Sequence, residues 1–181
     1  MALSDSDKEV LFSVARASIK GYLAGKKMPE ISESRAEIQK ACGAFVTIHK
    51  GGALRGCIGL FVSEKPLYKT VADMAVSAAF EDPRFPPLNA EELSEIDLEI
   101  SVLTPLKKIQ DASEIEVGRD GIYIIKGHSR GVLLPQVATE HGFDRETFLD
   151  QTCLKAGLAP GSWREGAEIY TFEAEIINEK E

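Results

Sequence analysis

A single cysteine stands between two glycines in the stretch Leu-Arg-Gly-Cys-Ile-Gly, residues 54–59. Because a glycine neighbour carries no Cβ, backbone, solvent or a ligand can approach such a residue closely. The stretch follows Gly51-Gly52, and residues 42–49 before that pair are rich in β-branched and aromatic side chains. Two strand-like runs around Gly-Gly predict a β-hairpin. The hairpin makes Cys57 a strand residue.

The loop of this hairpin decides which sheet face Cys57 occupies. If Gly51-Gly52 is a two-residue loop, Lys50 faces Ala53 and Cys57 faces Val46. With that pairing, Cys57 shares its face with Arg55, Ile48 and Val46. A β-bulge or an odd loop length reverses the facing.

The rest of the chain alternates between helical and strand periodicity. Helices are predicted from an Asp5 or Ser6 cap to about Gly25, and over residues 66–80, 135–141 and 144–157. Strands are predicted over residues 96–103, 122–126, 132–134 and 167–177. Helices and hairpins interleave without a regular βαβ rhythm. This pattern indicates an α+β fold, with a mostly antiparallel central sheet flanked by helices.

Charge and cysteine content limit the classes of partner. The 181 residues carry a formal net charge of −8, which argues against broad binding to nucleic acid or to anionic membranes. The first residues are acidic and lack the apolar stretch of a secretory signal. No apolar run reaches the roughly 18–20 residues that span a bilayer. Three widely spaced cysteines are typical of reduced thiols, so we expect a cytoplasmic protein.

Several segments together resemble the AMMECR domain family, whose prokaryotic members are called AmmeMemoRadiSam system protein A. The resemblance covers nearly the whole chain, so we expect residues 1–181 to form one AMMECR domain. The matching segments are Leu54–Gly59, Glu81–Leu88, Leu98–Pro105, Gly118–Gly121, Arg130–Val137, Phe148–Leu158, Trp163 and Ile169–Glu175.

The resemblance implies two unequal lobes with a cleft between them, and we expect the smaller lobe around residues 42–88. It also implies association with a Memo-type protein and a radical-SAM enzyme. It does not imply an established activity.

Cys57 is the candidate catalytic residue, as a nucleophile or redox group. A free thiol has a pKa near 8.5, so a reactive cysteine needs a positive neighbour or a base. His128, in the turn over residues 127–131, is a weaker candidate base. Alternatively, it lies at the tip of a hairpin and has no catalytic role. The competing interpretation makes Cys57 a small packed hydrophobe in a strand.

Arg55 and Arg84 are candidate substrate-binding residues, together with Gly56 and Gly59. An arginine fork on a rigid loop suits a carboxylate or phosphate. The competing interpretation pairs these arginines, and Arg119 and Arg130, with internal carboxylates such as Asp82 or Asp120.

We predict no metal site, because the Cys and His residues lack metal-ligand spacing, and no cofactor, because phosphate-binding glycine motifs are absent. Two functions remain in view. One is an enzyme with a cysteine-centred site for an anionic small molecule or peptide. The other is a non-catalytic docking partner for the Memo-type and radical-SAM proteins.

Overall fold

The computed structural model describes residues 3–25 and 33–180, and its first hairpin turns at Gly51-Gly52 as predicted. Strands β1 (Ala44–Lys50) and β2 (Ala53–Leu60) are antiparallel, with Lys50 opposite Ala53. Both loop glycines have positive φ, 58° and 79°, which side-chain-bearing residues rarely adopt. This is the backbone of a tight two-residue hairpin loop.

The chain divides into two compact units. Unit 1 contains the described residues up to Leu103 and those from Glu175 onward, and unit 2 is Thr104–Ala174. Residues 42–88, which we expected to build the smaller lobe, therefore lie in the larger unit. The physical reason is that β1 pairs with both β2 and β3 (Ile96–Leu103), so the hairpin is the middle of a larger sheet.

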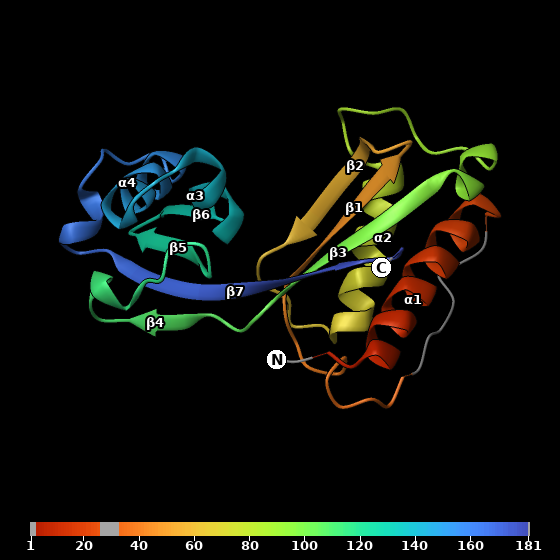
Figure 1. The fold of residues 1–181 in the computed structure, drawn as a ribbon, viewed down its shortest axis with the longest axis horizontal. Coiled ribbons are helices and arrows are strands. Elements are labelled where there is room, and N and C mark those ends of the chain that lie inside the picture. Colours follow the sequence, from red (N-terminus) through yellow and green to blue (C-terminus); the bar gives the residue numbers. More distant parts are fainter. Residues whose placement is uncertain (1–2, 26–32, 181) are drawn as a thin grey trace. The chain divides into compact units, whose positions relative to one another are not determined.

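In unit 1, helices α1 (Asp5–Leu23) and α2 (Leu67–Phe80) lie side by side against the strands (Figure 1). The strand order in unit 1 is β2-β1-β3-β7. Strand β7 spans Glu168–Asn178, and its residues from Glu175 onward belong to unit 1. The α1 cap is Ser4, not Asp5 or Ser6: its side chain accepts from the Asp7 N–H, and the Asp7 carboxylate accepts from the Ser4 N–H. Apolar side chains of both helices and the sheet form one core, including Leu11, Ile19, Val46, Ile48, Val71, Leu98 and Ile100.

In unit 2, β7 pairs on one side with β4 (Lys107–Ile109) and on the other with β5 (Asp120–Lys126), which pairs with β6 (Ser129–Leu133). Helices α3 (Pro135–His141) and α4 (Arg145–Lys155) supply a second core, in which Phe148, Leu149 and Cys153 pack with Ile122 and Ile124. Short 3₁₀ turns occupy Glu91–Ser94, Ala112–Glu114 and Ser162–Arg164.

The pairings β1–β2, β1–β3, β4–β7, β5–β6 and β5–β7 are all antiparallel, so the predicted α+β class with a mostly antiparallel sheet is confirmed. Within the described residues, no helix has the length and apolar character required to cross a bilayer. A cytoplasmic location stays a prediction.

Candidate functional site

The strand register places Cys57 opposite Thr47, not opposite Val46 as the sequence predicted. The cause is an irregularity near the hairpin loop: Ile48 pairs with Gly56 and His49 with Leu54, so Arg55 is an extra residue on β2. One extra residue shifts the alternation of side chains by one and reverses the facing. Val46 and Ile48 are buried in the core with α2, and Cys57 lies on the opposite sheet face with Thr47.

The Cys57 thiol is half-buried, and the Thr47 hydroxyl donates a hydrogen bond to its Sγ over 3.2 Å. The other two cysteines are different, since Cys42 and Cys153 are both buried. Cys57 is thus the least buried of the three cysteines. Thr47 was missed in the sequence because only the bulge brings it opposite Cys57.

The backbone N–H and carbonyl groups of Cys57 are each bound by a side chain from the loop after α2. Asp82 Oδ2 accepts from the Cys57 N–H over 2.9 Å, and Arg84 Nη2 donates to the Cys57 carbonyl oxygen over 3.3 Å. Arg84 also forms a two-point ion pair with Asp82, through Nε at 2.9 Å and Nη2 at 2.7 Å. Asp82 and Arg84 therefore bind polar groups of β2, an edge strand of unit 1, where a further strand would otherwise pair.

Asp82 and Arg84 differ sharply in exposure: the Asp82 side chain is 2% exposed and the Arg84 side chain 53%. Hydrogen bonds from Arg84, followed by those from the backbone N–H groups of Cys57 and Arg84, hold the Asp82 pKa well below its usual range despite its burial. The pair is thus ionised at neutral pH, with its anion buried and half of its cation in solvent.

Arg55 is engaged in an internal ion pair, with the side chains of Arg55 and Glu92 only 12% and 11% exposed. Its Nε and Nη2 donate to the two carboxylate oxygens of Glu92, over 3.0 and 2.9 Å. Lys50 and the Asn89 N–H also donate to Glu92. The Arg55 hydrogen bonds are the largest cause that lowers the Glu92 pKa to about 2.

The other two candidate arginines, Arg119 and Arg130, differ from each other. Arg119 pairs with Asp120 in unit 2 through Nε and Nη2, as Arg84 does with Asp82. Asp82 and Asp120 were the internal partners that the sequence suggested, whereas Glu92 was missed because 37 residues separate it from Arg55. Arg130 lies exposed on β6.

Close packing accounts for both glycines of the motif. A Cβ on Gly56 would overlap the backbone carbonyl oxygen of Ala78, so the glycine lets α2 approach β2. A Cβ on Gly59 would overlap the ring of Phe45 on the neighbouring strand. Substrate contacts of Gly56 and Gly59 stay a prediction.

His128 belongs to unit 2, where it is exposed in the turn between β5 and β6. Cys57 belongs to unit 1, so a role of His128 as the base stays a prediction. Among the residues that the structure describes, no cluster of three or more His, Cys, Asp or Glu side chains is arranged to hold a metal ion.

Comparison with known proteins gives the same family as the motifs. The model of the AMMECR1 family matches residues 12–177. The chain belongs to the AMMECR1 family. It is 42% identical to protein Mbar_A1807 of Methanosarcina barkeri, over 99% of this chain and 93% of the relative. It is 47% identical to protein MJ0810 of Methanocaldococcus jannaschii, over 92% and 87%.

A solved structure supports the fold. The uncharacterized protein PH0010 from Pyrococcus horikoshii superimposes with a TM-score of 0.84 at 40% identity, over 98% of this chain and 94% of that chain. None of these three proteins is named for an activity.

Proposed function

We propose that this AMMECR1-family protein is an enzyme in which Cys57 is the nucleophile or redox group and Arg84 binds an anionic group of a small molecule or peptide. One observation carries the proposal. The Sγ atom of Cys57, the least buried of the three cysteines, accepts a hydrogen bond from the Thr47 hydroxyl. The backbone N–H and carbonyl groups of Cys57 are bound by Asp82 and Arg84.

The Thr47 hydrogen bond supports thiolate chemistry. A donor aimed at sulfur stabilises the anion more than the neutral thiol, and the thiolate is the nucleophilic form. The clamp on the Cys57 peptide supports positioning, since a reacting atom must be held within about 0.5 Å of its productive place.

Arg84 is the residue that binds the anionic group of the substrate. Its Nε and Nη2 atoms face Asp82, which leaves the Nη1 end of the planar guanidinium directed away from that carboxylate. Half of the side chain is exposed, so a carboxylate or phosphate can reach it. Arg55, enclosed with Glu92, is better suited to supporting the strand than to binding substrate.

The test compares two alkylating reagents of similar size, anionic iodoacetate and neutral iodoacetamide, on protein carrying Cys42→Ser and Cys153→Ser. Glutathione gives the intrinsic ratio of the two rates. The proposal expects Cys57 to react while folded and to favour iodoacetate at least threefold more than glutathione does. Arg84→Gln removes the preference, and Arg84→Lys restores part of it.

Arg130→Gln is the matched control, because it removes one exposed positive charge from unit 2. It leaves the ratio unchanged. A Cys57 that reacts only after unfolding, or a ratio equal to that of glutathione in every variant, overturns the proposal. The pH profile of the rate in His128→Gln tests the predicted base: a profile identical to that of the parent removes His128 from the site.

A docking role is the second candidate, and exposed aliphatic side chains at the edge of the sheet favour it. Leu54 and Leu60 on β2 and Val62 just beyond it are all exposed. Such residues suit a protein surface that contacts a partner. The partners implied by the family resemblance are a Memo-type protein and a radical-SAM enzyme. A stable complex that survives Cys57→Ala but is lost in Arg84→Ala favours docking over catalysis.

A further inference from the structure

The sheet of unit 1 has a second edge, formed by the last residues of β7. The Glu179 N–H donates to the Leu98 carbonyl oxygen of β3 over 3.1 Å, so the backbone of Glu179 faces β3. Backbone polar groups alternate in direction along a strand. The N–H and C=O groups of Ile176 and Asn178 therefore face away from β3, toward the free edge.

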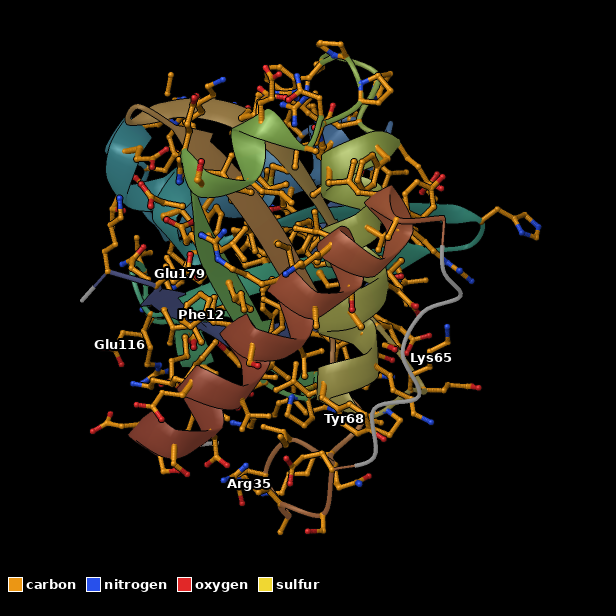
Figure 2. The ribbon with its side chains drawn as sticks, turned by 90° about the vertical axis from the view of Figure 1, so that its right-hand side faces the viewer. Phe12, Arg35, Lys65, Tyr68, Glu116 and Glu179 are labelled. Atoms are coloured by element: carbon orange, nitrogen blue, oxygen red, sulfur yellow. The ribbon has the colours of Figure 1, made fainter. Side chains whose placement is uncertain are left out.

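A groove runs beside this edge, between β7 and the first turns of α1. Its volume is about 360 Å³, and its lining includes Asp5, Glu9 and Phe12 from α1 and Ile176 and Asn178 from β7. Figure 2 shows Phe12 and Glu179 beside each other at this side of α1. Phe12 is half-buried and Ile176 is exposed. The groove thus offers apolar surface next to strand backbone that, in the described part of the chain, no other strand pairs with.

The groove contains both paired and unpaired charged side chains. Lys8 pairs with Glu175 at 3.4 Å, and Arg16 holds Glu179 through Nε and Nη2 at 2.5 and 2.7 Å. Asp5 and Glu9 are exposed, and within residues 3–25 and 33–180 no cation lies at ion-pair distance from either. One turn of helix separates them, about 6 Å along the axis, which is close to the two-residue repeat of an extended chain at about 6.6 Å.

The two edges of this sheet differ in whether side chains bind the outward backbone groups. On β2, Asp82 and Arg84 occupy the polar groups of Cys57 and block strand addition there. On β7, the groove is lined by the apolar side chains of Phe12 and Ile176 and by the carboxylates of Asp5 and Glu9, with Lys8 among its other lining residues. Proteins commonly protect a sheet edge that has no partner, and an edge left open beside a groove is suited to an added strand.

We propose that this groove binds an extended segment of a partner protein, which adds as a strand beside Ile176 and Asn178. The segment carries two Lys or Arg residues two positions apart, facing Asp5 and Glu9, followed by an aliphatic side chain that contacts Phe12 and Ile176. This site is independent of the Cys57 chemistry and holds whether or not the proposed enzyme activity does.

Fluorescence anisotropy with a labelled Lys-Thr-Lys-Thr-Val-Thr-Val peptide tests the site. The Glu-Thr-Glu-Thr-Val-Thr-Val peptide has the same pattern with opposite charge, and a version N-methylated at alternate amides cannot form the ladder. Both are expected to bind at least tenfold more weakly. In an amide exchange experiment, the lysine peptide protects the N–H groups of Ile176 and Asn178 and leaves that of Cys57 unchanged.

Two sets of variants locate the binding. Asp5→Asn with Glu9→Gln weakens the lysine peptide at least fivefold, whereas Glu140→Gln with Glu165→Gln, a matched loss of two exposed charges in unit 2, leaves affinity unchanged. Ile176→Pro removes one outward N–H without touching the β3 ladder, and it also weakens binding. Equal affinity for the lysine and glutamate peptides overturns the proposal, as does self-association of the chain that Ile176→Pro abolishes.

Discussion

The Asp82 carboxylate lies 2.9 Å from the backbone nitrogen of Cys57, although 25 residues separate them in the chain. This contact joins the loop after α2 to the edge strand that carries the thiol. Since Arg84 binds both Asp82 and the Cys57 carbonyl, the three residues form one hydrogen-bonded unit. The loop therefore fixes the Cys57 backbone.

Asp82→Asn should reduce the free energy of unfolding by about 1.5–3 kcal/mol at pH 7, the usual worth of a hydrogen bond to a charged group. The amide keeps one acceptor oxygen but loses the charge that binds Arg84. Because Arg84 is half in solvent, the loss stays below that of a fully buried ion pair. Urea unfolding measures the change, with the neighbouring exposed Glu81→Gln as control. A change within 0.5 kcal/mol of the control would show that the clamp does not stabilise the fold.

Glu92→Gln should destabilise the protein at pH 7 by about 1.5–3 kcal/mol, and the effect should fade in acid. The folded-state pKa of Glu92 is about 2, below its ordinary value of 4.5. The folded state thus binds this proton less tightly than the unfolded state, so the stabilisation is present above pH 4.5 and is lost as pH falls toward 2. Unfolding curves from pH 7 to pH 2 follow the difference between the two proteins.

Glu95→Gln provides the comparison for this prediction. Glu95 pairs with Lys50 at 2.8 Å but is 55% exposed, so its removal should cost no more than about 1 kcal/mol. A Glu92→Gln difference that is constant down to pH 2 would contradict the assigned ion pair.

Gly56→Ala should cost about 1–3 kcal/mol, the usual penalty of overpacking. The new methyl group would overlap a backbone oxygen of α2, at Ala78, so helix and strand have to separate. Thermal or urea unfolding measures the loss. Combining it with Ala78→Gly should bring no relief, because the obstacle is the carbonyl and not the Ala78 side chain; recovery in the double variant would refute this packing account.

Local patterns predicted much of the fold. The Gly-Gly pair indicated the first hairpin, and the alternation of Ile96, Leu98 and Ile100 indicated a half-buried strand, whose three apolar side chains are buried. These features depend on neighbours in sequence. The Ser4 cap was also local, but its partner Asp7 is a shorter acid than the Glu or Gln of the usual capping box.

The candidate site is formed by contacts that the alternation of apolar and polar residues along the sequence does not predict. Arg55 is the extra residue of β2, and it reverses the sheet face on which Cys57 lies. The Arg55 guanidinium binds Glu92, which follows α2 in the chain. The lobe boundary was misplaced for a similar reason: β1 pairs with β3, about 50 residues away, which puts residues 42–88 in the larger unit. A single sequence carries no record of such pairings.

Cys42 should make the protein less stable in alkali. Burial raises the pKa of its thiol to about 11, whereas an unfolded-state thiol ionises near 8.5. The unfolded state therefore loses the proton first, and stability falls as pH rises from about 9 to 11. Cys42→Ala removes this dependence, so the stability of the wild type relative to the variant should be constant from pH 6 to 8 and should then fall by about 3 kcal/mol by pH 11. A difference that does not change between pH 9 and 11 would mean that Cys42 ionises as freely in the folded protein as in the unfolded chain.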